Sequence, residues 1–136
     1  MEQKKLSRTE LMKIGSRELA YLGDSIYEAC IRKRLMLDGV PEIRHMNERS
    51  EDYVSASSQA AILDEIEDEL TDEEKAVARR GRNSRIKHPA KSASIQEYRK
   101  ATALESVFGY LSVTGNDERI EELADIVFAA GKRGKR

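Results

Sequence analysis

Two acids, each in an apolar helical stretch that also holds a glycine, are the residues best suited to chemistry. Asp24 directly follows Gly23, and Glu105 lies one helical turn before Gly109. At about 100° per residue, each carboxylate falls on or beside an apolar helix face. Burying one carboxylate costs several kcal/mol, but two carboxylates that converge on a divalent cation, with water filling its other positions, offset that cost. The pair therefore predicts a magnesium site.

The glycines indicate how such acids could meet. A glycine costs roughly 1 kcal/mol relative to alanine inside a helix, so Gly23 suggests that another backbone passes close to it. A simpler alternative is that Asp24 is a half-solvated acid favoured by the helix dipole. Glu28 lies one turn later, about 5–6 Å away between β-carbons. It could act as an outer acid of the site, or be a solvated residue near Arg32.

The elements that must position these acids are helical almost throughout. No run of alternating apolar and polar residues bounded by hairpin turns is present. Capping boxes mark helix starts, and glycine or proline marks helix ends. We expect an all-α bundle. The expected helices are one capped by Ser16 and ending near Leu37, one opening at Asn47 or Ser50 and running to Leu70, one from Thr71 (boxed with Glu74) to Gly81, one starting at Ser94 (boxed with Glu97), a last one from Asn116, and a weak one over 6–14.

Length and composition fit one domain with a modest core, since the chain has 136 residues and 39% hydrophobic content. We expect the domain to cover residues 1–131 and a basic tail, 132–136, to be disordered. No apolar run approaches the ~20 residues needed to span a bilayer, and the start lacks the apolar core of a signal peptide. A cytoplasmic protein is expected. Cys30, the one cysteine, is interpreted as a core residue.

Charge is unevenly distributed, although the formal net charge is only -1. Residues 64–74 hold eight acids and no base, whereas residues 79–100 hold eight bases and one acid. A long, non-periodic connection over 81–93 carries Arg82, Asn83, Arg85 and Lys87. Such a segment suits the phosphates and hydroxyls of the minor groove of double-stranded RNA. The alternative is a solvated loop.

Other catalytic arrangements are excluded by what the sequence lacks. The two histidines, His45 and His88, are far apart in the chain, and no Ser or Cys has a recognisable nucleophile setting. No glycine-rich phosphate loop is present. A histidine-based nuclease, a triad hydrolase and a P-loop enzyme are therefore not expected, which leaves the acids.

The residues around both acids carry a family resemblance. Leu22-Gly23-Asp24-Ser25 together with Leu104-Glu105-Ser106-Val107-Phe108-Gly109 resembles the two acidic motifs of the ribonuclease III domain, and within that family its small single-domain branch, Mini-III. The likeness extends to segments 53–60, 79–83 and 96–99. Two acids of the full-length family's signature are replaced by Ala20 and Thr102, and Mini-III resembles this sequence in lacking them.

The resemblance implies a metal-dependent endoribonuclease acting on double-stranded RNA, with Asp24 and Glu105 as catalytic residues and ligands of Mg2+. The expected products carry a 5′-phosphate and a 3′-hydroxyl. It also implies a ribonuclease III-type fold, RNA recognition by the catalytic domain itself, maturation of precursor large-subunit (23S) ribosomal RNA, and a possible ribosomal protein that presents the substrate. A homodimer is implied too, and an apolar arc around Tyr21, Ala20 and Leu35 is expected to supply its interface.

Two other classes of function stay open at this point. The first is a catalytically inactive ribonuclease III-like module that binds RNA or the ribosome, suggested by Ala20 and Thr102. The second is a helical adaptor whose acidic and basic faces bind protein partners. Retention of Asp24 and Glu105 argues against the first, and the pairing of glycine with acid argues against the second.

Overall fold

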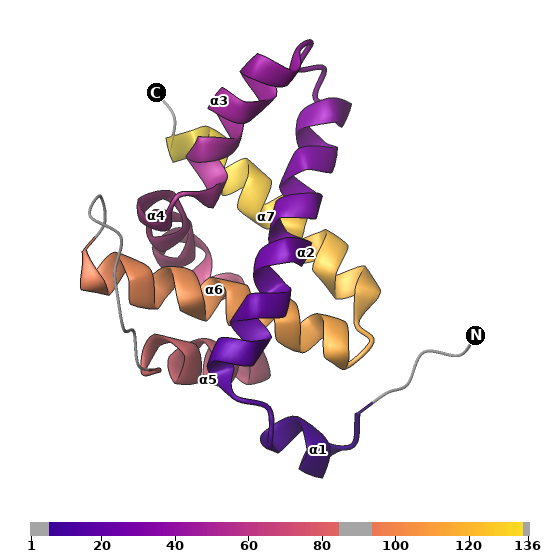
Figure 1. Ribbon diagram of the computed structural model, residues 1–136, viewed down its shortest axis with the longest axis vertical. Helices are drawn as coiled ribbons and strands as arrows, with labels where there is room; N and C mark the ends of the chain where they lie inside the picture. The colour runs from indigo at the N-terminus through magenta and orange to yellow at the C-terminus, as the bar shows by residue number, and fades with distance from the viewer. Residues whose placement is uncertain (1–5, 85–93, 135–136) are drawn as a thin grey trace.

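Residues 6–84 and 94–134 are described by a computed structural model, and all regular secondary structure in these two ranges is helical. The predicted all-α fold is confirmed (Figure 1). The elements are α1 (Arg8–Met12), α2 (Ser16–Leu37), α3 (Ile43–Val54), α4 (Ala56–Ile66), the 3-10 turn η1 (Glu67–Glu69), α5 (Asp72–Arg82), α6 (Ile95–Val113) and α7 (Asp117–Gly134).

Capping boxes fix the starts of three helices. The predicted boxes of Thr71 with Glu74 and of Ser94 with Glu97 open α5 and α6. In each box the hydroxyl accepts a backbone N–H three residues on, while the carboxylate accepts the N–H of the cap residue. Ser7 forms a third box with Glu10 and starts α1, so the weak N-terminal helix is present with a start defined by its cap.

Several predicted helix boundaries are wrong. The helix expected to open at Asn47 or Ser50 begins at Ile43, and the end predicted at Leu70 is replaced by the end of α4 at Ile66, followed by η1. Ser16 is the first helical residue of α2, whose N-cap is Gly15 and has no side-chain cap bond. The single helix expected from Asn47 or Ser50 to Leu70 is instead α3 followed by α4, because Ser55 adopts an extended conformation (φ -64°, ψ 152°) and its hydroxyl accepts the N–H of Ser58. A serine that caps a new helix ends the old one.

Part of the segment predicted to be a disordered basic tail is helical. Helix α7 continues through Gly134 and so includes residues 132–134, while residues 135–136 lie outside the described part of the chain. The Lys132 ammonium lies 2.8 Å from an Asp38 carboxylate oxygen, and the Arg133 guanidinium lies 2.6 Å from Glu65. These ion pairs compensate the positive charge that suggested a frayed end.

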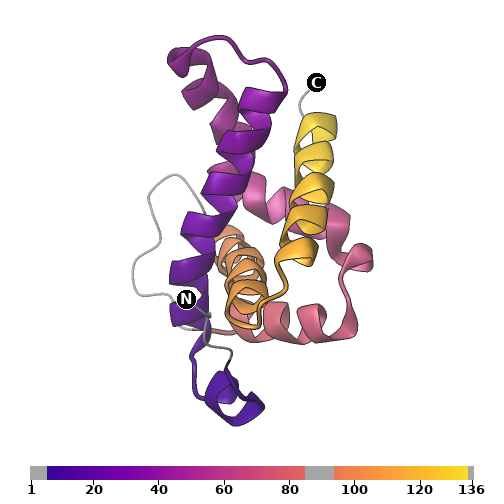
Figure 2. The ribbon, with the colours of Figure 1, turned by 90° about the vertical axis from the view of Figure 1, so that its right-hand side faces the viewer.

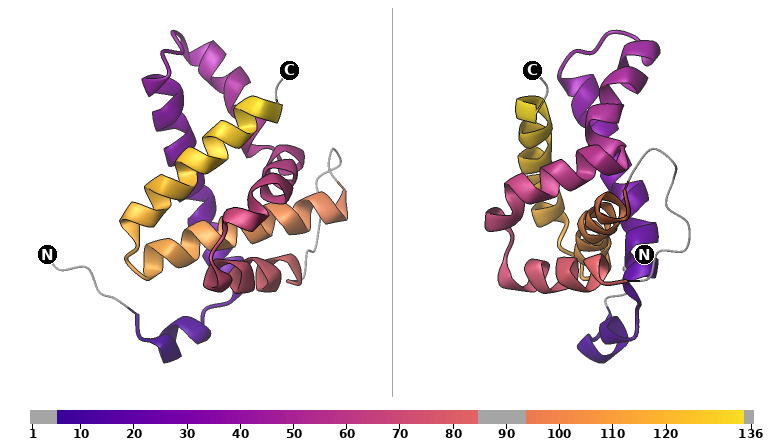
Figure 3. Two further views of the ribbon diagram at one scale, coloured as in Figure 1. Left: turned by 180° about the vertical axis from the view of Figure 1, so that it is seen from behind. Right: turned by 90° about the vertical axis from the view of Figure 1, so that its left-hand side faces the viewer.

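Helix α6 is the central element of the bundle. In Figure 1, α2 crosses α6, while α4 and α5 lie on either side of it; Figure 2 and the rear view in Figure 3 show α7 covering the opposite face. Because α6 is surrounded, its buried residues occupy several faces. The largest fully buried side chains of the core are Tyr27, Ile31, Leu35, Tyr53, Leu63, Ile66, Leu104, Val107, Phe108, Leu123 and Val127.

The expected apolar arc for dimerisation is only partly at the surface. Leu35 and Ala20 are buried in the core, at 0% and 8% exposure, whereas Tyr21 is 86% exposed. The helical spacing placed all three residues on one broad side of α2, but α6, α3 and α7 pack against α2 and cover much of its apolar surface. Cys30 is buried and unpaired, as predicted. No helix in the two described ranges has the length and apolar character needed to cross a bilayer.

Candidate active site

The backbones of α2 and α6 touch at two glycines. A β-carbon built on Gly23 would lie 1.7 Å from the carbonyl oxygen of Glu105, and one built on Gly109 would lie 2.0 Å from the carbonyl oxygen of Leu19. Both distances are far shorter than any real contact, so only glycine fits at either position. The predicted close approach of a second backbone at Gly23 is confirmed. Since Asp24 is its neighbour in α2, the crossing brings Asp24 to Glu105.

Glu105 and Asp24 are close enough to perturb each other. Burial raises the pKa of Glu105 to about 8, with further increases from the negative charge of Asp24 and from a hydrogen bond between the two carboxyl groups. Glu105 is half-buried, while Asp24 is exposed. One acid of the pair is therefore held in the protein and the other faces solvent, so that an ion can reach both from outside.

Glu28 belongs to the same electrostatic environment. Its negative charge also raises the pKa of Glu105, yet its carboxylate lies 3.5 Å from the guanidinium of Arg32, one turn further along α2. Both sequence interpretations of Glu28 thus have support. Within residues 6–84 and 94–134, no three His, Cys, Asp or Glu side chains are grouped so as to hold a metal ion.

The donor set fits a hard divalent cation. Two carboxylates supply oxygen ligands and negative charge, and Mg2+ is bound in many proteins by one or two carboxylates with water in its other positions. The two positions that carry acids in full-length ribonuclease III add no ligand here. Ala20 is buried, and the Thr102 hydroxyl donates to the carbonyl of Tyr98, 2.9 Å away in its own helix.

One polar side chain at this site was not identified from the sequence. Gln59, on α4, is only 2% exposed. Its Nε2 donates a hydrogen bond to Oε2 of Glu105, with 3.5 Å between the two atoms. This contact lowers the pKa of Glu105, against the effect of burial. The sequence held one indication, because Gln59 lies in the 53–60 segment that carries the family resemblance. However, no sequence pattern distinguishes a functional neutral amide from an ordinary one.

The predicted RNA-binding residues are only partly described. Arg82 ends α5 with its guanidinium 3.0 Å from a Glu67 carboxylate oxygen. Asn83 is the exposed C-cap residue of α5. Arg85 and Lys87 lie outside the described residues. Lys100 pairs with Asp64 at 2.9 Å, so the acidic and basic stretches that are separate in the sequence partly neutralise each other in space.

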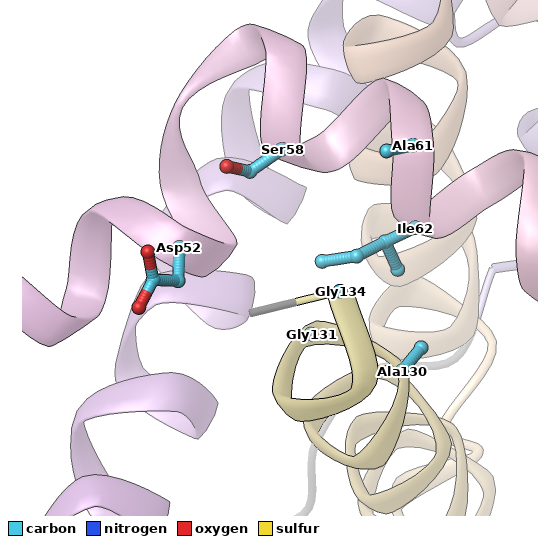
Figure 4. Close-up of a pocket in the computed structure, with 7 residues that line it drawn as sticks. All are labelled: Asp52, Ser58, Ala61, Ile62, Ala130, Gly131 and Gly134. Atoms are coloured by element: carbon cyan, nitrogen blue, oxygen red, sulfur yellow. The ribbon is translucent and has the colours of Figure 1, made fainter. Parts of the chain in front are cut away.

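A separate hollow lies between α4 and α7, where the end of α3 also approaches (Figure 4). It contains neither acid of the pair. Gly131 opens this region, because a β-carbon there would lie 2.3 Å from the ring of Tyr53. The lining residues are Asp52, Ser58, Ala61, Ile62, Ala130, Gly131 and Gly134. With one carboxylate among small and apolar side chains, it has no second acid for the chemistry described above.

Comparison with known proteins identifies the family. The ribonuclease III domain family matches residues 17–116, a range that includes both acids. A Mini-ribonuclease 3 from Brevibacillus brevis is 40% identical over 111 residues, 82% of this chain and 83% of the relative. Another, from Symbiobacterium thermophilum, is 39% identical over 117 residues, 86% of this chain and 90% of the relative.

A solved structure supports the fold. The crystal structure of a protein from Fusobacterium nucleatum is similar with a TM-score of 0.77 and 33% sequence identity, covering 86% of this chain and 93% of that one. The resemblance to the ribonuclease III domain and to Mini-III is confirmed. This chain belongs to the ribonuclease III family of endoribonucleases, with its relatives in the Mini-ribonuclease 3 group.

Proposed function

We propose that this protein is a cytoplasmic, magnesium-dependent endoribonuclease that cleaves double-stranded RNA at the Asp24–Glu105 pair. The observation that carries the proposal is the glycine crossing of α2 and α6, which holds a half-buried carboxyl group against an exposed one. Membership of the ribonuclease III family indicates the class of reaction. The close approach of the two helix backbones explains why glycine is required at positions 23 and 109. The products would carry a 5′-phosphate and a 3′-hydroxyl.

In this proposal Asp24 and Glu105 hold Mg2+, which when bound lowers the pKa of a water and stabilises charge on the scissile phosphate. The protein's own contribution is placement and charge. Glu105 is fixed by the packing of α6 against α2 and α4, while Asp24 lies at the surface, where a duplex can approach it. Together they supply carboxylate oxygens for a cation, while burial and the neighbouring Asp24 raise the pKa of Glu105 to about 8.

Recognition of the duplex is assigned to Arg82, Asn83, Arg85 and Lys87. Exposed Asn83 at the end of α5 supports an RNA-facing position, and the basic run that follows supplies charge for phosphates. Arg82 is already paired with Glu67, so we expect it to contribute less than Arg85 or Lys87.

The finer assignments rest on the likeness to Mini-III. We propose that two copies assemble into a symmetric dimer with two identical sites, that the substrate is precursor 23S ribosomal RNA, and that a ribosomal protein presents it. Tyr21, which is exposed on α2 three residues before Asp24, supports an interface there, although Ala20 and Leu35 are in the core.

The test is a cleavage assay on long duplex RNA, with and without Mg2+. Wild-type protein should cut only with the metal, and Asp24→Asn and Glu105→Gln should each abolish cutting while helicity and duplex binding persist. Glu48→Gln, at an exposed position on α3, serves as the control and should cut normally. Duplex binding without cleavage by the wild type would instead identify an inactive RNA-binding module, and substantial cleavage by both acid variants would refute the assignment.

A further inference from the structure

We propose that Gln59 is a positioning residue that holds one oxygen of Glu105 and leaves the other oxygen to face Asp24 and the cation. The inference rests on the proposed metal site and deepens it. Gln59 and Glu105 come from different helices, α4 and α6, and the amide nitrogen of Gln59 contacts Oε2 of Glu105 alone among the hydrogen-bond partners found in residues 6–84 and 94–134.

The burial of Gln59 requires an explanation. The side chain is 2% exposed, and burying an amide is unfavourable unless the amide is hydrogen-bonded. The other buried residues of α4 are all apolar: Ala60, Ile62, Leu63 and Ile66. An apolar side chain of similar volume would therefore pack at least as well at this position. The amide has a use only through the group that it contacts, which is the Glu105 carboxylate.

A neutral donor suits this task better than a charged one. A lysine or arginine beside Glu105 would neutralise the carboxylate and compete with a cation for it. The amide of Gln59 orients the carboxylate by one N–H and leaves the negative charge of the pair available. Hydrogen bonds of this kind to ligand side chains commonly fix their orientation and strengthen metal binding.

The 3.5 Å separation is longer than the ordinary N–H···O distance of about 2.9–3.0 Å. The contact is therefore a weak hydrogen bond, which orients the Glu105 carboxylate without neutralising it.

The 53–60 segment is built in a way that places Gln59 there. Ser55 ends α3 and caps α4, which puts Gln59 in the first turn of the new helix. The buried hydroxyl of Tyr27, on α2, donates to the carbonyl of Tyr53 at 2.5 Å. The segment is thus tied at one end to the helix of Asp24 and at the other to Glu105. This gives a physical role to a motif that otherwise contributes no acid or base.

The proposal is tested with Gln59→Met, which keeps the volume and removes the donor. Binding of Mn2+ is measured by electron paramagnetic resonance, alongside kcat and KM for duplex RNA at several Mg2+ concentrations. We expect Mn2+ affinity to fall about 10- to 100-fold. We also expect kcat to fall at low Mg2+ and recover at high Mg2+, while KM for RNA stays within about twofold. Ile62→Met, a matched change at a buried position of the same helix, should leave Mn2+ affinity unchanged.

A second variant covers the case in which Gln59→Met does not fold. Gln59→Asn keeps the amide but is one methylene too short to reach Oε2, and it should weaken Mn2+ binding in the same direction. Wild-type Mn2+ affinity in a folded Gln59 variant, or equal losses in the Gln59 and Ile62 variants, would overturn the positioning role. Asp24→Asn separates failure of the metal site from failure of the Gln59 role. Wild-type Mn2+ affinity in Asp24→Asn as well would refute the metal site. A loss of affinity in Asp24→Asn but not in the Gln59 variants would refute only the role of Gln59.

Discussion

Replacing Glu105 by glutamine should stabilise the metal-free protein, and the gain should grow as the pH rises. The pKa of Glu105 is about 8 in the folded protein against 4.5 for an ordinary glutamate, chiefly because the side chain is buried and secondly because Asp24 is negative. The folded state therefore binds the proton more tightly than the unfolded chain does. It follows that Glu105 destabilises the fold increasingly as the pH rises from about 4.5 to about 8.

The size of the effect follows from that difference. Each pH unit above the unfolded pKa costs about 1.36 kcal/mol until the folded pKa is reached. The cost is then about 3 kcal/mol at pH 7 and about 1 kcal/mol or less at pH 5. Glutamine has nearly the same shape and never ionises, so Glu105→Gln removes this cost without creating a cavity.

Urea unfolding in EDTA at pH 5, 7 and 8.5, followed by circular dichroism, measures the free energy of unfolding of both proteins. The difference between variant and wild type should rise with pH, and Glu48→Gln, at an exposed position on α3, should show no such rise. Equal pH dependence in wild type and Glu105→Gln would refute the description of Glu105 as a buried acid next to Asp24.

Three more predictions concern the glycine crossing, the proposed dimer and the basic residues Arg85 and Lys87. Gly23→Ala should lose about 3 kcal/mol of unfolding free energy, because its β-carbon meets backbone that cannot move aside. The control, Gly134→Ala, has open space around it and should be neutral or gain up to about 1 kcal/mol in the same urea titration. A mixed dimer of one wild-type and one Asp24→Asn subunit, purified with two tags, should nick duplex RNA rather than sever it on native and denaturing gels, and full double-strand cuts in one binding event would contradict the two-site picture. Replacing Arg85 and Lys87 by alanine should weaken duplex binding and reduce its salt slope by about 1 per lost phosphate contact, whereas an unchanged slope would move recognition elsewhere.

Much of the fold could be predicted because its signals are local. The boxes at Thr71 and Ser94 are set by residues three apart, and the starts of α5 and α6 followed from them. The break at Ser55 was missed because the helical spacing of apolar residues continues across it. Ser55 could either continue one long helix or end α3 and cap α4, and the sequence does not distinguish the two. Such a choice is made by packing against the rest of the bundle.

In the candidate site, too, only the residues with local sequence signals could be predicted. Asp24 and Glu105 were found because an acid and a glycine on an apolar face conflict with both burial and helix propensity, and this conflict pointed to a close crossing. Gln59 gave no such conflict, since a neutral amide on a helix is common, and its contact with Glu105 exists only in three dimensions. Likewise, the pairing of Arg82 with Glu67 joins two stretches that the sequence shows only as separate charge runs.

The proposed metal site is tested most directly by a crystal structure of the protein soaked with Mn2+, with anomalous scattering used to locate the metal. We expect one anomalous peak bound by the carboxylates of both Asp24 and Glu105, absent from crystals of Asp24→Asn under the same conditions. A peak away from this pair, or none at a Mn2+ concentration that supports cleavage of duplex RNA, would contradict it.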